Sequence, residues 1–289
     1  MASHEKRRSV QVEIKRYLQC YQEKTSLQPR QIRVLDYGCG SGEAVLDLKN
    51  LGYDAYGVDV DEAAIISARK LLSINQWDGE KILTAYHVGE ALPFPDSFFH
   101  FVFSQEVIEH VGDLSAMAGE IRRVTIPTGM GFHIFRPQFN FIEPHFGMPF
   151  VHWLPKNQWR RWAILLFAYM GLGMRPPEIP GAGPRQRGEF LYKYSIERTF
   201  YRPYRKIGEA FRRNGFDVCC TALNHRRLHS SPLLLGLLNR PLVRAWIEWL
   251  IVTFHTSYIL TLIPDGDVDP EISMGKWTGK FLPAFSNHQ

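Results

Sequence analysis

The heptapeptide QEVIEHV brings together side chains that could bind a metal ion. Glu106, Glu109 and His110 stand at positions i, i+3 and i+4, which share one face of a helix. Carboxylate oxygens favour Mg²⁺ or Mn²⁺, whereas an imidazole favours Zn²⁺. A fourth ligand would come from His133 or His145, and the sequence leaves that choice open. The alternative is that Glu109 and His110 only support the structure of a loop.

The nonapeptide VLDYGCGSG indicates a second kind of site, one for a small ligand. It places Gly38, Gly40 and Gly42 directly after a run typical of a buried strand. Glycine at such a point lets the backbone turn sharply and approach a ligand closely. Asp59 follows 21 residues after Gly38, near the roughly 20 expected for a carboxylate that binds a ribose.

Two acidic positions narrow the identity of that ligand. A dinucleotide fingerprint needs glycine where this chain has Glu43, and a carboxylate there is a poor neighbour for a pyrophosphate. Asp36 can instead serve a cationic amino group. S-adenosylmethionine, an adenosine joined to a cationic amino acid, meets both conditions, and a nicotinamide dinucleotide is the weaker alternative.

These residues need a sheet to position them, and the hydrophobic pattern predicts one. Runs typical of buried strands alternate with helical segments after an amphipathic N-terminal helix. The expected strands are 32–36, 55–59, 82–87, 99–104, 131–135, 216–223 and 257–263, and the main helices are 42–50, 62–73, 114–124, 157–171 and 202–213. We therefore expect an α/β fold: a Rossmann-like, seven-stranded, mostly parallel sheet with helices on both faces and a lid insertion after the fifth strand.

We interpret residues 1–289 as a single domain with three parts. The parts are a cofactor-binding core at 30–135, a lid and substrate insertion at 136–200, and the C-terminal part of the sheet at 201–265. The stretch RPPEIPGAGPRQRG within the insertion predicts a mobile loop. The apolar segment 232–254 predicts a pair of helices over the core, an interfacial helix or an apolar channel for an acceptor.

Between about residues 33 and 135 the chain resembles the class I S-adenosylmethionine-dependent methyltransferases of the type 11 and ubiquinone-biosynthesis group. The resemblance lies in VLDYGCGSG, AYGVDVDEAAIISAR and GEALPFPDSFFHFVFSQEVIEHV. The cofactor contacts that it implies are Asp36, Gly38, Gly40 and Gly42 around the methionine half, Asp59 at the ribose with Val60 beside it, Gly89, Glu90 and Ala91 near the adenine, and Gln105 at the methyl-transfer pocket. Val88 and His100 depart from the family, whose members often have Asp at these positions.

Removing a proton from a hydroxyl acceptor requires a base or a metal ion. The Glu-x-x-Glu-His pattern resembles the metal ligands of small-RNA 2′-O-methyltransferases and of some ubiquinone-pathway O-methyltransferases. His145 and His110 are the catalytic candidates, and His133 and His152 are further ones. The simpler interpretation of His145 and His152 is a structural role in a proline-rich lid.

The predicted activity is O-methylation of a small-molecule, glycan or lipid-linked acceptor. Alternatives are metal-dependent O-methylation of RNA ribose or of a quinone-like phenol, C-methylation, and a non-catalytic module that binds S-adenosylmethionine.

The charge distribution bears on the partners. Residues 41–120 carry 4 Lys+Arg against 14 Asp+Glu, whereas residues 156–213 carry 13 against 4. The basic segment favours an anionic acceptor or an anionic membrane surface, and nucleic acid is not favoured. The N-terminus lacks the apolar run of a signal peptide, and the four cysteines show no metal or disulfide pattern. We therefore expect a cytoplasmic protein, with peripheral membrane contact as an option; the oligomeric state is left open.

Overall fold

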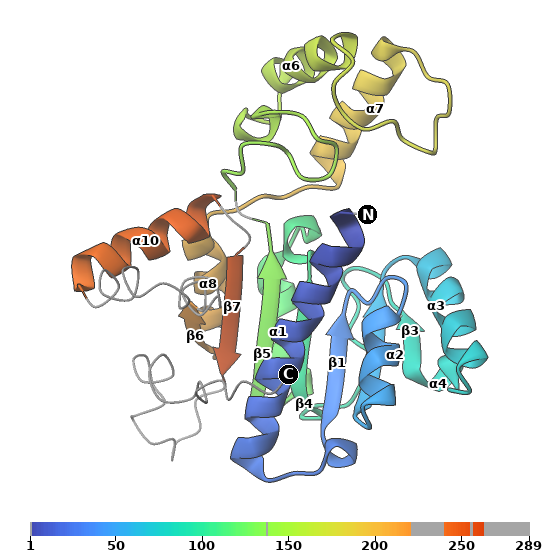
Figure 1. Ribbon diagram of the computed structural model, residues 1–289, viewed down its shortest axis with the longest axis vertical. Helices are drawn as coiled ribbons and strands as arrows, with labels where there is room; N and C mark the ends of the chain where they lie inside the picture. The colour runs from blue at the N-terminus through green and yellow to red at the C-terminus, as the bar shows by residue number, and fades with distance from the viewer. Residues whose placement is uncertain (1, 137, 221–239, 255–256, 263–289) are drawn as a thin grey trace, which may run out of the picture.

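The computed structural model describes residues 2–136, 138–220, 240–254 and 257–262, whose central feature is one twisted sheet (Figure 1). Its strands are β1 (Arg33–Tyr37), β2 (Asp54–Asp59), β3 (Leu83–Ala85), β4 (Phe99–Gln105), β5 (Thr125–Phe135), β6 (Asp217–Cys220) and β7 (Ser257–Leu262). They lie in the order β3-β2-β1-β4-β5-β7-β6. The first five strands in this order, from β3 through β2, β1 and β4 to β5, pair in parallel. Strand β7 is antiparallel to both of its neighbours. This arrangement confirms the predicted α/β Rossmann-like class.

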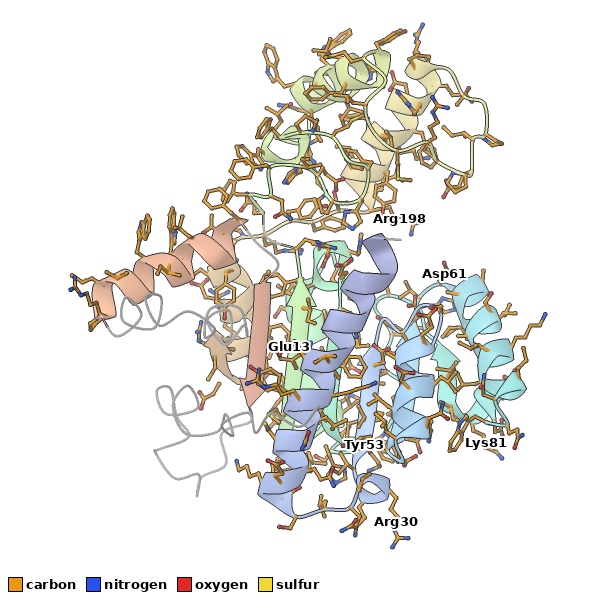
Figure 2. All side chains as sticks on the ribbon, in the orientation of Figure 1. Glu13, Arg30, Tyr53, Asp61, Lys81 and Arg198 are labelled. Carbon is orange, nitrogen blue, oxygen red and sulfur yellow. The ribbon has the colours of Figure 1, made fainter. Side chains whose placement is uncertain are left out.

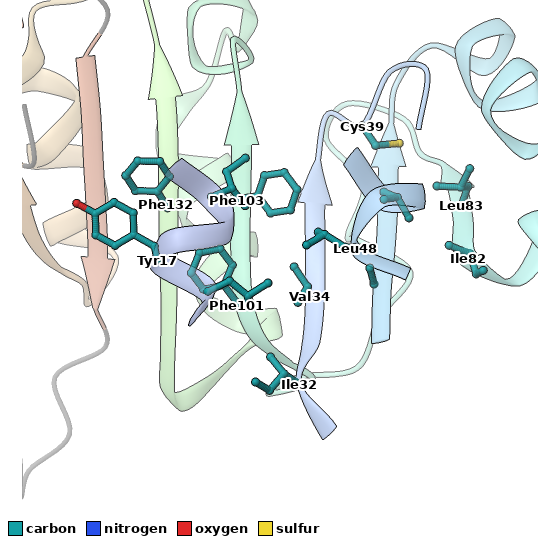
Figure 3. Close-up of a cluster of buried hydrophobic side chains, with 14 of the residues drawn as sticks. Tyr17, Ile32, Val34, Cys39, Leu48, Ile82, Leu83, Phe101, Phe103 and Phe132 are labelled. Carbon is teal, nitrogen blue, oxygen red and sulfur yellow. The ribbon is translucent and has the colours of Figure 1, made fainter. Parts of the chain in front are cut away.

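Helices cover both faces of the sheet, and each face has its own hydrophobic core. One core packs α1 (Ala2–Thr25), α2 (Glu43–Asn50) and α3 (Glu62–Ile74) against inward side chains of the strands, as Figure 3 shows for Tyr17 and Leu48. The other core packs α5 (Leu114–Val124) and α8 (Tyr204–Arg213) on the opposite face. Strands buried on both faces read as nearly continuous apolar runs, which is why FHFVF and RVLDY were recognisable as strands.

Several strand boundaries differ from the prediction, and two of the differences have local reasons. The fifth strand was expected to begin after Gly129, but β5 runs through that glycine, where a Cβ would lie 2.3 Å from a methyl carbon of Thr125. Glycine is therefore required there by close packing rather than by a break in the strand. The third strand starts later than expected because α4 (Gly79–Ile82), capped by the Asp78 side chain, occupies its predicted first residue.

The segment between β5 and α8 forms a separate helical layer. It contains η3 (Val151–Trp153), α6 (Gln158–Tyr169) and α7 (Pro184–Glu197) around its own small apolar cluster. Figure 1 shows α6 and α7 beyond the carboxyl-terminal ends of the parallel strands. The helix predicted at 157–171 is confirmed by α6. The loop predicted at 175–188 was too long, because α7 begins at Pro184, and proline is well tolerated in the first turn of a helix.

The C-terminal region is described in part. Helix α10 (Pro241–Phe254) accounts for one helix of the apolar segment, and its predicted partner lies outside the described residues, as does the chain from residue 263 onward. None of the helices in the described ranges is long and apolar enough to cross a membrane.

Candidate active site

The loop after β1 shows why three glycines follow the strand. Gly38, Gly40 and Gly42 have φ angles of 83°, 48° and 75°, a region that side chains disfavour. A Cβ on Gly38 would lie 2.3 Å from a Val107 methyl, and one on Gly42 would lie 2.9 Å from the Ala68 Cβ. A Cβ on Gly40 would meet nothing within 4 Å. Packing therefore requires glycine at Gly38 and Gly42, whereas the space beside the Gly40 Cα is open.

Asp59, the last residue of β2, connects this loop to β2 by a hydrogen bond. Its carboxylate accepts hydrogen bonds from the backbone N–H groups of Gly40, at 2.8 Å, and Asp61, at 3.0 Å. The Tyr86 N–H donates to the Asp59 carbonyl at 3.1 Å. Three of the predicted cofactor residues follow Tyr86 on an exposed loop: Gly89, Glu90 and Ala91. The exposed Val60 follows Asp59 directly, so the predicted cofactor residues border one edge of the sheet.

Asp36, in β1, is a buried acid directly before the glycine loop. Only 3% of its surface is exposed. Burial, with the nearby charge of Asp59 as a second cause, raises the pKa of the Asp36 carboxyl from its usual 3.8 to about 8. A cationic ligand group would favour its ionised form. The carboxylates of Asp36 and Asp59 thus fit a ligand that carries both an ammonium group and ribose hydroxyls, as S-adenosylmethionine does.

Replacing Asp59 by Ala is expected to weaken S-adenosylmethionine binding by about 1–3 kcal/mol, the usual loss for a hydrogen bond to a charged group. Calorimetric titration measures the effect. Asp61→Ala is the matched control, because Asp61 caps α3 and its loss should lower the melting temperature without changing affinity. Equal affinity in Asp59→Ala and the wild-type protein would remove Asp59 from the ribose site.

A second cluster lies past the ends of β4 and β5. Glu109 and His110 belong to the short helix η2 (Ile108–His110), and His145 lies in the loop after β5. One ligand atom from each of the three side chains lies within 4.8 Å of the others. His145 was predicted as a possible fourth metal ligand, and the structure does bring it to the Glu109 and His110 pair.

Glu109 is unusual within this cluster. It is 1% exposed, and within the described residues neither carboxylate oxygen has a hydrogen-bond partner. Burial, reinforced by the charge of Glu106, raises the pKa of Glu109 from 4.5 to about 7. A buried carboxylate without partners is costly. A bound cation would compensate that cost directly.

Both histidines are oriented through Nδ1. The His110 Nδ1 lies 2.5 Å from the Arg198 carbonyl oxygen, which can only accept. The His145 Nδ1 lies 3.0 Å from the Glu143 carboxylate and 2.6 Å from the Tyr201 hydroxyl. Nδ1–H donation leaves Nε2 with its lone pair, the arrangement that metal-binding histidines usually have. Burial also lowers the pKa of His110, which favours the neutral ring that a metal ligand needs.

The carboxylate behind His145 is itself fixed by several donors. Glu143 is fully buried and accepts from the backbone N–H groups of His145 and Phe146 and from the Tyr201 hydroxyl. Burial opposes ionisation of Glu143, but the hydrogen bonds and charge of His145 together with the Tyr201 bond lower its pKa overall. Sequence reasoning missed both Glu143 and Tyr201. The only signal for Glu143 was its place two residues before His145.

Three other candidates lie outside the cluster. The predicted ligand Glu106 forms an ion pair with Arg136 instead. His133 is enclosed in the sheet with its Nδ1 2.9 Å from the Ser104 hydroxyl, and burial lowers its pKa to about 3. His133 therefore cannot supply the fourth ligand. His152 is buried as well, with its pKa lowered to about 4, which agrees with a structural role.

Gln105, the last residue of β4, lies between the two clusters in the sequence. Its buried side-chain Nε2 has no hydrogen-bond partner among the described residues. Its place at the methyl-transfer pocket stays a prediction.

Residues 35–132 match the family model described as a methyltransferase domain. The match supports a class I S-adenosylmethionine-dependent methyltransferase domain in this part of the chain. Its cofactor is S-adenosylmethionine, as the glycine loop and the acids predicted.

Curated relatives of this methyltransferase domain include O-methyltransferases. A ubiquinone biosynthesis O-methyltransferase from Rhodopseudomonas palustris (strain BisB5) is 31% identical over 159 residues, which cover 52% of this chain and 61% of the relative. A probable chloroplastic tocopherol O-methyltransferase from Oryza sativa subsp. japonica is 33% identical over 97 residues, covering 32% of this chain and 26% of the relative. The chain thus spans about half the length of the ubiquinone relatives that it matches. It covers 51% of the ubiquinone biosynthesis O-methyltransferase from Rhodopseudomonas palustris (strain BisA53).

Solved structures are more distant. A SAM-dependent methyltransferase from Aquifex aeolicus is 16% identical and covers 65% of this chain and 73% of its own, with a TM-score of 0.38. The strand order described above, rather than this likeness, establishes the fold.

Proposed function

We propose that the protein transfers the methyl group of S-adenosylmethionine to a hydroxyl oxygen of a small-molecule acceptor, with a divalent cation at Glu109, His110 and His145. The observation that carries this proposal is the buried carboxylate of Glu109 beside two histidines that are both held through Nδ1. The relatives named as ubiquinone and tocopherol O-methyltransferases support oxygen as the methylated atom.

At the cofactor end, the chain's own groups would bind and orient. S-adenosylmethionine supplies an electrophilic sulfonium methyl group when bound. Asp59 would hold the ribose, Asp36 the ammonium group, and the open face at Gly40 would admit the methionine half. Gln105 would donate from its free amide at the junction with the acceptor. Methyl transfer depends mainly on alignment, which such fixed contacts favour strongly.

At the acceptor end, the cluster would prepare the nucleophile. A divalent cation would lower the pKa of a coordinated hydroxyl and orient it. Glu143 and the Arg198 carbonyl would keep the two imidazoles in the ligating tautomer. The helical layer of α6 and α7 would act as a lid, because His145 lies on the chain that enters it from β5 and Arg198 follows α7 (Figure 2).

A second mechanism uses the same residues without a metal. The His145–Glu143 contact at 3.0 Å also suits a general base whose tautomer is fixed by a carboxylate. Exhaustive chelation separates the two. Loss of turnover that Mg²⁺, Mn²⁺ or Zn²⁺ restores, with unchanged cofactor affinity, supports the metal; full turnover in metal-free protein supports His145 as the base.

An acceptor panel tests the function as a whole. S-adenosylhomocysteine release is expected with hydroxyl compounds, foremost quinol-like phenols, and then with glycan and lipid-linked hydroxyls. RNA with free ribose 2′-hydroxyls and a carbon acceptor are the comparisons, and a product on either would replace the proposed acceptor. Tight cofactor binding without turnover on any acceptor would instead support a non-catalytic binding module.

A further inference from the structure

Helices α6 and α10 both expose large apolar side chains, several of them aromatic. On α6, the outward positions are apolar at spacings of three and four residues, so they share one helical face: Trp159, Trp162, Leu166 and Tyr169, followed by Met170. Trp159 is 73% exposed. The opposite face of α6 already packs Ile164 and Ala168 into the apolar cluster of the helical layer, so the fold does not use the outward face.

Helix α10 has a second exposed apolar face. Its exposed apolar residues, Leu242, Trp246 and Trp249, are again spaced by four and three residues, and Leu242 is 86% exposed. Ring contacts connect α10 with η3, which precedes α6: Phe141 packs on Trp153 at 5.9 Å and on Phe254 at 5.6 Å, and Phe254 packs on Trp249 at 6.3 Å. Figure 2 shows side chains projecting from both helices away from the sheet. We call the exposed apolar residues of α6 and α10 the aromatic surface.

Exposed charge on the helical layer that contains α6 is mainly positive. Between residues 153 and 198 the exposed basic side chains outnumber the exposed acidic ones; they are Lys156, Arg175, Arg185, Lys193 and Arg198 against Glu178 and Glu197. Tryptophan and tyrosine are the residues that settle at the level of lipid headgroups. Cations beside an apolar helical face add attraction to anionic lipids.

We propose that the aromatic surface docks the protein on an anionic lipid bilayer as a peripheral contact. The inference goes beyond methyl transfer, because docking needs neither cofactor nor acceptor. No described helix can span a membrane, so α6 and α10 would lie in the plane of the headgroups. The lid that carries His145 would then be next to the lipid phase.

Co-sedimentation of the full chain with lipid vesicles tests this, with no cofactor or acceptor present. The wild-type protein should bind mixed phosphatidylcholine and phosphatidylglycerol vesicles more strongly than phosphatidylcholine alone, and less strongly as salt rises. Combining Trp159→Ser with Trp162→Ser should lower the partition coefficient by about tenfold or more, because less apolar area is buried. Both substituted side chains are exposed, so this double variant leaves the packed core residues unchanged.

The matched control combines Ile66→Ser with Ile74→Ser, since these side chains are equally exposed on α3. The control should bind vesicles as the wild-type protein does, and all proteins should keep their melting temperature and cofactor affinity. Equal vesicle binding by the two double variants would overturn the proposal, as would a wild-type protein that ignores anionic vesicles at low salt. Sedimentation velocity adds one more decisive outcome: a dimer that only the tryptophan variant dissociates would assign the surface to a second copy instead.

Discussion

Glu109→Gln is expected to lower kcat/KM for methyl transfer by about 10²–10⁴-fold, the range for losing assistance to proton removal. The amide keeps the shape of the side chain but has no charge, so it is a weaker ligand for a divalent cation. Cofactor affinity should stay unchanged, because Glu109 lies in the acceptor cluster. Release of S-adenosylhomocysteine and calorimetric titration of S-adenosylmethionine measure the two effects.

A stability measurement separates this role from a structural one. Folding raises the pKa of Glu109 from 4.5 to about 7, so the folded state binds more protons across that window and the chelated protein loses stability as pH rises through it. Glu109→Gln should remove this loss and melt higher at pH 8 (about one unit above that pKa). Exposed Glu80→Gln is the matched control. A Glu109→Gln protein that melts lower at every pH and keeps its turnover would show that Glu109 only supports the loop.

Asp36→Asn is expected to show opposite effects on binding and on stability. Loss of the carboxylate should weaken S-adenosylmethionine binding by roughly tenfold to a hundredfold, because the ammonium group loses a charged partner. In the free wild-type protein the pKa of Asp36 is raised from 3.8 to about 8. Between these two pH values the folded state binds more protons than the unfolded state. The free energy of unfolding of the wild-type protein therefore falls as pH rises from about 4 to 8.

The asparagine cannot ionise, so the cofactor-free variant should be more stable than the wild type at pH 8, by on the order of a few kcal/mol. At pH 4 the two proteins should differ little. Chemical denaturation at both pH values gives the comparison. A pH-independent difference, or unchanged cofactor affinity, would contradict the assignment of Asp36 to the ammonium group.

The cofactor half of the site could be predicted because its signals are local. Gly38, Gly40 and Gly42 follow their strand directly, and Asp59 ends the next strand. Sequence could not separate the glycines by role, however. That distinction depends on Val107 and Ala68, which only the fold brings to the loop.

The acceptor half was predicted only in part, because its geometry is not local. The i, i+3, i+4 argument assumed a continuous helix through QEVIEHV. Glu106 has a φ of 54° instead, and only the short helix Ile108–His110 follows. The Glu106 side chain therefore forms an ion pair with Arg136 and does not join the cluster of Glu109. Tyr201, 56 residues from His145, could not be found from spacing at all.

The most direct test of the proposed cation site is calorimetric titration of Mn²⁺ into chelator-treated wild-type protein with S-adenosylmethionine present. The arrangement of Glu109, His110 and His145 predicts a single saturable site, and binding should weaken strongly in Glu109→Gln and His145→Ala. The absence of binding by Mn²⁺, Mg²⁺ and Zn²⁺ alike, in a wild-type protein that still binds its cofactor, would contradict a cation site at these residues.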